Sequence, residues 1–169
     1  MRRPEEKIVE VAALESLLEM APGEREGLVL ANGIFDLVHV GHVRYLEGAR
    51  KAGRSLLVAM NSDASARRLK GAGRPLLPIA ERMEIVAALQ CVDWVTCFEE
   101  ETVERLLRRL LPAAHAKGTD YTVASVPERA VAESLGIRTV IVGDPKRHAT
   151  SDLIRLIRES ADPERSGRG

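Results

Sequence analysis

The chain has 169 residues, the size of one domain with a hydrophobic core of its own. Lysine plus arginine and aspartate plus glutamate both number 25, so the net charge of zero gives no support for binding to nucleic acid or to a membrane surface. No apolar run has the roughly 18 residues of a membrane span, and the first residues do not lead into a signal-peptide core. We therefore expect a cytoplasmic protein, in which Cys91 and Cys97 are free thiols.

The first expected elements are a helix, a strand and a second helix. Apolar residues at helical spacing predict a helix over residues 7–20, and a Pro-Gly pair ends it. Residues 27–32 are predicted to form a short buried strand. Residues 42–52 are predicted to form a helix that ends at Gly53.

The rest of the chain continues this alternation. Further strands are expected over residues 55–60, 93–97, 113–116 and 138–142. Further helices are expected over residues 63–70, 79–90, 101–111, 126–135 and 150–160.

Five strands alternating with helices predict a single Rossmann-like α/β domain over residues 1–160. Its five-stranded parallel sheet should carry helices on both faces. Residues 161–169 are mostly polar, and we expect a disordered tail there. In such sheets ligands bind beyond the carboxyl ends of the strands, so the loops after the strands are the places to look for a site.

The loop after the first strand has the composition of a phosphate site. Gly33 lets the chain turn as it leaves the strand, and Gly41 has no side chain to keep a phosphate from the backbone. His42 begins a helix whose N-terminus attracts anions, and both His39 and His42 can donate imidazole N–H groups to a polyphosphate. The same His-x-x-His spacing also fits a metal site or packed histidines, but its place between a strand and a helix favours phosphate.

From Gly33 to His42 the chain reads Gly-x-Phe-Asp-x-x-His-x-Gly-His, which resembles the signature of the cytidylyltransferase-like nucleotidyltransferases. The similarity continues through residues 61–75, 82–83, 91–95, 98–100 and 117–121. Within that superfamily these stretches are most similar to heptose 1-phosphate adenylyltransferases, the adenylyl-transferring half of bifunctional ADP-heptose synthases. The similarity does not include the kinase half of those enzymes, and 169 residues leave no room for it. We therefore expect a separate kinase to supply the sugar 1-phosphate.

The resemblance implies a reaction, a metal and an assembly. AMP would pass from ATP to a heptose 1-phosphate, giving ADP-heptose and pyrophosphate. The attacking phosphate is already ionised, so positioning and charge stabilisation suffice, without a protein nucleophile or a strong base. Mg²⁺ would arrive with the triphosphate, no dedicated metal site is expected, and relatives of this kind form homodimers.

The resemblance also implies roles for named residues. The residues expected to act directly in catalysis are Asp36, His39, His42 and Arg82. Those expected to contact the nucleotide are Gly33, Ile34, Phe35, His39, Gly41, His42, Lys117, Asp120, Arg147, Thr150 and Ser151. Those expected to contact the acceptor are Asp36, Asn61, Asp63, Lys70 and Arg74.

Several of these assignments have a plain structural alternative. Lys70, Arg74 and Arg82 are candidate phosphate clamps, although most lysines and arginines simply face solvent. Arg82 is the strongest of the three because its predicted helix is mostly apolar. Asn61 and Asp63 are also suited to capping a helix.

One stretch departs from the family pattern. Before the last helix the family has an acidic residue, Gly, any residue and then Ser-Thr-Thr, whereas this chain has Lys-Arg-His-Ala-Thr-Ser over residues 146–151. The hydroxyls of Thr150 and Ser151 remain at the helix start, and we expect Arg147 to attract the triphosphate. The departure concerns the substrate more than the reaction. Beside a heptose 1-phosphate adenylyltransferase, three alternatives stay open: a cytidylyltransferase for glycerol 3-phosphate or a similar alcohol phosphate, a non-catalytic nucleotide-binding regulatory module, and a protein that binds a metal through His39 and His42.

Overall fold

A computed structural model describes residues 2–144 and 150–161 of the chain. The expectations for residues 146–149, including Arg147, and for the tail beyond residue 161 lie outside the described residues.

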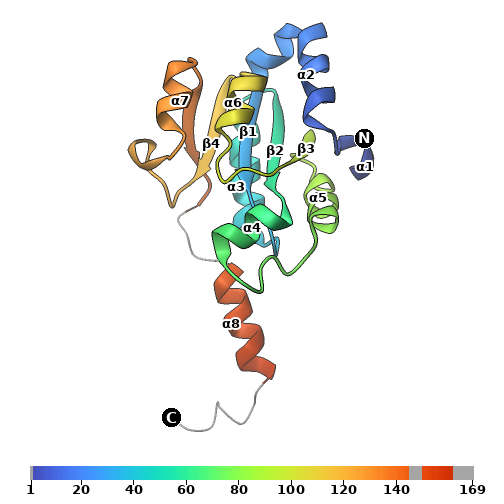
Figure 1. Cartoon of the computed structure of the whole chain (residues 1–169), viewed down its shortest axis with the longest axis vertical. Helices are drawn as coiled ribbons and strands as arrows, with labels where there is room; N and C mark the ends of the chain where they lie inside the picture. Colours follow the sequence, from blue (N-terminus) through green and yellow to red (C-terminus); the bar gives the residue numbers. More distant parts are fainter. Residues whose placement is uncertain (1, 145–149, 162–169) are drawn as a thin grey trace.

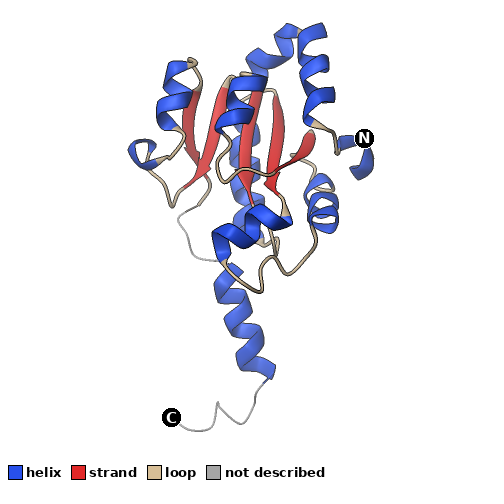
Figure 2. Cartoon of the chain, viewed as in Figure 1, coloured by secondary structure: helices blue, strands red, loops and turns tan. Residues whose placement is uncertain are grey.

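Five parallel strands form one sheet with the order β3-β2-β1-β4-β5 (Figure 2). The strands are β1 (Leu28–Gly33), β2 (Ser55–Asn61), β3 (Trp94–Phe98), β4 (Ala114–Gly118) and β5 (Arg138–Val142). In this order β1 is central, with Leu30 opposite Leu57 of β2 on one side and His115 of β4 on the other. The predicted α/β domain with a five-stranded parallel sheet is confirmed.

Helices connect the strands and flank the sheet (Figure 1). The α-helices are α1 (Pro4–Lys7), α2 (Val11–Met20), α3 (Val40–Lys51), α4 (Asp63–Lys70), α5 (Ile79–Ala87), α6 (Glu104–Leu110), α7 (Arg129–Ser134) and α8 (Thr150–Ala161). Two short 3₁₀ helices are η1 (Pro22–Gly27) and η2 (Val123–Ser125).

Both faces of the sheet are buried, because successive strand residues point to opposite sides and nearly all are apolar. Val29 and Ala31 of β1 face the cluster that α3 and α5 complete. Leu28 and Leu30 face the cluster that α2, α6 and α7 complete. The expected helices on both faces are therefore present, and Cys91 and Cys97 are free.

The N-terminal helix begins later than the sequence indicates. Apolar spacing predicts a helix from residue 7, but α2 starts at Val11, after the short helix α1. Ile8 forms an isolated parallel bridge with Val95 of the edge strand β3, and the Val9 N–H donates to the Val95 carbonyl oxygen at 2.9 Å. An exposed strand edge offers unpaired backbone groups, and pairing with them holds residues 8–9 extended instead of helical.

Candidate active site

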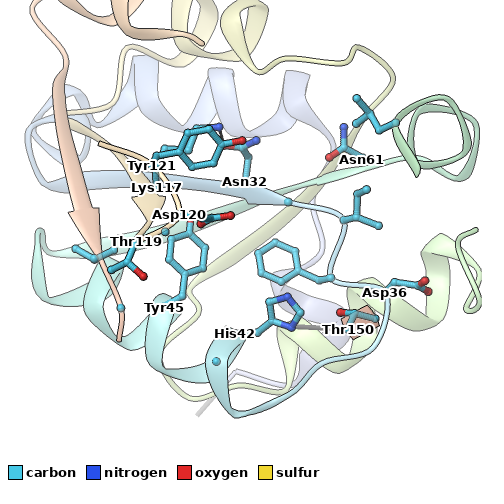
Figure 3. Close-up of a pocket in the computed structure, with 18 of the residues that line it drawn as sticks. Asn32, Asp36, His42, Tyr45, Asn61, Lys117, Thr119, Asp120, Tyr121 and Thr150 are labelled. Atoms are coloured by element: carbon cyan, nitrogen blue, oxygen red, sulfur yellow. Dashed lines mark hydrogen bonds between the residues drawn. The ribbon is translucent and has the colours of Figure 1, made fainter. Parts of the chain in front are cut away.

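A cavity of about 880 Å³ lies at the carboxyl ends of the strands (Figure 3). Its walls come from segments that follow each of the five strands, including the starts of α3 and α8. The chain runs from β1 toward β2 and β3 on one side of the sheet and toward β4 and β5 on the other. This reversal of strand order opens a crevice, the usual place for a ligand in a sheet of this kind.

An aromatic ring supports the loop that leaves β1. Phe35 has a left-handed backbone with φ of 50° and is buried. Its ring folds back over Gly33, where an added Cβ would lie 2.9 Å from a ring carbon. The same ring packs 5.2 Å from the His42 ring, centroid to centroid. The absence of a side chain at Gly33 therefore makes room for the Phe35 ring, whereas the left-handed turn of this loop lies at Phe35 and not at Gly33.

His39 and His42 cap the start of α3 reciprocally. His39 Nδ1 accepts from the Gly41 N–H at 3.1 Å, and His42 Nδ1 accepts from the His39 N–H at 3.4 Å. The two rings stack with centroids 3.9 Å apart. Because both Nδ1 atoms accept, hydrogen bonding assigns the proton of each neutral ring to Nε2.

The charge state of His42 follows from its surroundings. Burial lowers the pKa of His42 to about 4, and protonation of the neighbouring His39 ring would act in the same direction. A hydrogen bond with the backbone of Leu37 opposes this shift. His42 is therefore neutral at physiological pH, as the acceptor role of its Nδ1 atom requires.

Asp36 lines the cavity and fastens a neighbouring loop to it. One carboxylate oxygen accepts from the N–H groups of Leu76 and Leu77 at 2.7 and 3.0 Å. The other oxygen lies 2.6 Å from Nε of Arg74, although the pair lacks the alignment of a hydrogen bond. Asp36 thus brings Arg74 to the cavity wall.

Arg82 does not line the cavity, and the prediction that it clamps a phosphate is wrong. Its side chain is fully buried. Its guanidinium donates to the carbonyl oxygens of Leu77, Ile34 and Asn61 and to the Asp63 carboxylate. These five hydrogen bonds use all the N–H groups of the guanidinium, so none is left for a phosphate.

Asn61 ends β2 and Asp63 begins α4, and their side chains make different contacts. Asn61 lines the cavity, and its amide nitrogen donates to Ser65 Oγ at 3.0 Å and to the Glu100 carbonyl oxygen at 3.3 Å. Asp63 faces Arg82 instead and is absent from the cavity wall. The capping residue of α4 is Ser62, whose hydroxyl accepts from the Ser65 N–H. Lys70, at the end of α4, is exposed on the cavity wall.

The other wall of the cavity is built around Lys117 of β4. Its Nζ atom donates to Asn32 Oδ1 at 3.0 Å and forms an ion pair with Glu128 at 3.1 Å. The same Asn32 oxygen lies 3.0 Å from Nε2 of His115. Burial lowers the pKa of His115 to about 4, and the charge of Lys117 adds to the effect, whereas that of Glu128 opposes it.

The ends of β4 and β5 are tied to α3. The Tyr45 hydroxyl donates to the Ala116 carbonyl oxygen at 2.8 Å, and burial raises its pKa well above the usual range. Thr119 Oγ1 donates to the Asp144 carbonyl oxygen at 2.6 Å, and the Asp144 carboxylate pairs with Arg44 at 2.8 Å. These contacts fix the strand ends beside the start of α3.

No helix among the described residues is long and apolar enough to cross a membrane. Within residues 2–144 and 150–161, no group of three or more His, Cys, Asp or Glu side chains is arranged to hold a metal ion.

Comparison with known families identifies the chain. Residues 30–160 match the cytidylyltransferase-like family. The chain belongs to this family.

Two relatives of this cytidylyltransferase-like chain share the name bifunctional protein HldE. The bifunctional protein HldE of Geotalea uraniireducens is 46% identical over 158 residues, covering 94% of this chain and 32% of that protein. The bifunctional protein HldE of Geobacter sulfurreducens is 48% identical over 139 residues, covering 82% of this chain and 28% of that protein. The chain therefore spans about a third of the length of these curated relatives.

Solved structures share the fold. A lipopolysaccharide core biosynthesis protein from Thermoplasma volcanium has a TM-score of 0.61 and 23% identity, covering 70% of this chain and 98% of that one. A pantothenate synthetase from Thermus thermophilus has a TM-score of 0.58 and 18% identity, covering 85% of this chain and 63% of that one.

The structure brings most of the sequence-predicted residues of this family member to one cavity. The predicted residues on its wall are Gly33, Ile34, Phe35, Asp36, His39, Gly41, His42, Asn61, Lys70, Arg74, Lys117, Asp120 and Thr150. Asp63 and Arg82 lie behind the wall, and Arg147 lies outside the described residues. The side chain of Ser151, in the first turn of α8, also falls outside the description.

Sequence reasoning missed several residues of the wall. They include Asn32, Tyr45, Glu101, Thr102, Tyr121 and Glu128. Asn32 directly precedes the first quoted motif and Tyr121 ends the last one, so their positions beside a strand end were a usable signal. Glu128 follows an ordinary Val-Pro pair and is brought to the wall by tertiary packing.

Proposed function

We propose that the chain transfers AMP from ATP to a heptose 1-phosphate, giving ADP-heptose and pyrophosphate. The observation that carries the proposal is the stacked His39–His42 pair at the start of α3, on the wall of a cavity placed at the reversal of strand order. The similarity of the chain to cytidylyltransferase-like proteins supports the reaction type, and its resemblance to heptose 1-phosphate adenylyltransferases supports the acceptor.

The proposed step is an in-line displacement at phosphorus. An oxygen of the acceptor phosphate attacks the α-phosphorus of ATP. The bond from that phosphorus to the bridging oxygen of the β-phosphate breaks, and pyrophosphate leaves with the electron pair. No proton must be removed from the nucleophile, which agrees with a neutral His42 acting as a hydrogen-bond donor and not as a base.

The residues divide between the two substrates. In the proposal, His39, His42 and the backbone N–H groups of Ile34 and Phe35 hold the triphosphate, with Gly33 and Gly41 allowing close approach. Lys117 and Asp120 contact the nucleotide, and Thr150, Ser151 and Arg147 meet its phosphates from the last helix. The residues assigned to the acceptor are Asp36, Asn61, Lys70 and Arg74, all on the wall that continues from β1 and β2.

Mg²⁺ is part of the proposal as a companion of the triphosphate. The oxygens of Asp36 already face Leu76, Leu77 and Arg74, so they are poorly placed to serve as a main ligand set. The ion would be held mainly by phosphate oxygens, a common arrangement for magnesium, and would neutralise part of their charge.

The proposal also includes an assembly and a location. We propose a homodimer in the cytoplasm, a separate kinase that supplies the sugar 1-phosphate, and no nucleic-acid or membrane partner. The apolar face of α2 does not support the dimer, because Leu14 and Leu18 are buried against α6 of the same chain. The oligomeric state is tested by measuring the molecular mass with light scattering at micromolar protein concentration. A monomeric mass would rule out the proposed homodimer.

One assay tests the reaction. Pyrophosphate release is measured with each of the four nucleoside triphosphates against heptose 1-phosphates, hexose 1-phosphates and glycerol 3-phosphate, and products are identified by mass. We expect release with ATP and a heptose 1-phosphate. Release with CTP and glycerol 3-phosphate would establish a cytidylyltransferase instead. Binding of ATP without release from any acceptor would favour a regulatory module.

A further inference from the structure

A buried carboxylate lies on the cavity wall beside Lys117. Glu128 precedes α7 and is 2% exposed, and Lys117 at the end of β4 is 7% exposed. The Nζ atom of Lys117 lies 3.1 and 3.3 Å from the two oxygens of Glu128. Burying two charges is costly, and a buried ion pair often adds little to stability. Stability alone therefore does not explain this pair, and we consider a role in ligand binding.

The surroundings of Lys117 orient its ammonium group. One N–H donates to Asn32 Oδ1 and one to Glu128. His115 holds the Asn32 side chain in place. The Asn32 amide oxygen, which can only accept, lies 3.0 Å from Nε2 of His115 as well as 3.0 Å from Nζ of Lys117. An ammonium group has three N–H groups, so one remains for a ligand.

These side chains face the cavity together. Asn32, Lys117 and Tyr121 line its wall (Figure 3), and so does Glu128. Nζ of Lys117 lies 5.3 Å from the centre of the Tyr121 ring. The charges of Lys117 and Glu128 cancel. The pair therefore offers a directed donor without net positive charge, which suits a neutral acceptor atom better than a further phosphate.

We infer that Glu128 is a positioning residue that aims Lys117 at the nucleoside part of the nucleotide, the base or the ribose. This inference rests on the proposed function for the identity of the ligand. His39, His42 and the start of α8 remain the groups that hold the triphosphate. Selectivity for a nucleotide over a bare polyphosphate then depends on the Lys117–Glu128 pair.

The test compares two ligands in the absence of any acceptor. Dissociation constants of ATP and of inorganic tripolyphosphate, each with Mg²⁺, are measured by calorimetry for the wild type and for Glu128→Gln. The variant keeps an acceptor for Lys117 but leaves its positive charge uncompensated. We expect the affinity for ATP relative to tripolyphosphate to fall about ten-fold, the scale of one charged hydrogen bond, while tripolyphosphate binds unchanged or more tightly.

A matched control lies on the same helix. Glu133 of α7 pairs with Arg129 at 2.7 Å on the surface, where both side chains are about half exposed. Glu133→Gln should leave the ratio of the two affinities unchanged. The inference would be overturned if Glu128→Gln weakened the binding of ATP and of tripolyphosphate equally, or if it left both affinities unchanged, because the ratio of the two affinities would then stay the same.

A second variant covers the case in which Glu128→Gln does not fold. Replacing Lys117 and Glu128 together by Gln removes both buried charges and keeps hydrogen-bonding groups. A folded double variant that retains the wild-type ratio would also overturn the inference. The binding measurements contain no acceptor, so they do not depend on turnover. If the separate pyrophosphate assay showed no release with any sugar phosphate, the proposed reaction would be wrong, but the ratio of the ATP and tripolyphosphate affinities would still test the role of Glu128.

Discussion

The Asp36 carboxylate lies 2.6 Å from Nε of Arg74, and the same carboxylate accepts hydrogen bonds from the N–H groups of Leu76 and Leu77. The Asp36 side chain is buried and that of Arg74 is 20% exposed. One residue of the loop after β1 thus fixes both the loop before α5 and the arginine that the second loop carries. Its substitution should affect the folded state as well as the site.

Asp36→Asn tests this relationship. The amide oxygen can still accept from the N–H groups of Leu76 and Leu77, but the ion pair with Arg74 is lost. We expect the free energy of unfolding to fall by about 1–3 kcal/mol, measured by urea denaturation. Asp144→Asn breaks an exposed pair with Arg44 and should cost about 1 kcal/mol or less. Equal effects of the two substitutions would contradict the anchoring role of Asp36.

His39→Asn separates the cap of α3 from catalysis. Asparagine keeps an oxygen that can accept from the Gly41 N–H, so the helix start should be preserved. It lacks the Nε2–H that we assign to the triphosphate, and we expect kcat to fall by about 10²-fold, the scale of a lost transition-state donor. The same loss is expected for His42→Ala. A folded His39→Asn variant with a near-normal kcat would refute the assignment.

Stability should decline in mild acid because His42 and His115 are neutral when folded. Their pKa values are about 4 in the folded chain and near 6.5 when exposed, so between these values the unfolded chain binds more protons. The stabilising contribution is complete above about pH 6.5 and is lost as the pH falls toward 4, by at most about 1.4 kcal/mol per pH unit for each histidine.

The measurement is the urea midpoint at several pH values from 7 to 5. Carboxylates also titrate toward the acid end, so the informative quantity is the difference between the wild type and His115→Gln. This variant keeps an N–H that can reach Asn32 and cannot be protonated. Its stability should depend less steeply on pH, and parallel curves would contradict the neutral state of His115.

Arg82→Lys should be strongly destabilising, although Arg82 touches no ligand in our assignment. Lysine has three N–H groups and cannot replace the five hydrogen bonds that reach Leu77, Ile34, Asn61 and Asp63. We expect a loss of about 3 kcal/mol or more in the free energy of unfolding. The exposed Arg129→Lys substitution is the control and should change stability little.

Removal of magnesium should abolish turnover and spare the fold. If the ion arrives with the triphosphate, a chelator stops pyrophosphate release, while the circular dichroism spectrum and melting temperature of the chain stay the same. Loss of structure on chelation would point to a structural metal bound by the protein.

Local patterns were sufficient to predict the sheet and to predict that the loop after β1 lines the cavity. The strands are short apolar runs, and Gly33, Gly41 and the two histidines at the start of α3 stand within ten residues, so sequence order brings them together. Arg82 was misassigned because its acceptors are mostly backbone carbonyl oxygens from three separate segments, which no side-chain pattern displays. Glu128 was missed for a similar reason, since only packing of α7 against β5 and the neighbouring loop brings it to Lys117.

The central place of β1 in the sheet has a consequence for how such a protein can change during evolution. In the proposed reaction the acceptor wall continues from β2, the nucleotide wall from β4, and only the loop after β1 serves both. The two specificities are thus encoded in separate stretches of the gene. Substitutions after β2 can redirect the chain to a new acceptor while the contacts that select the nucleotide, and the histidines between them, stay as they are.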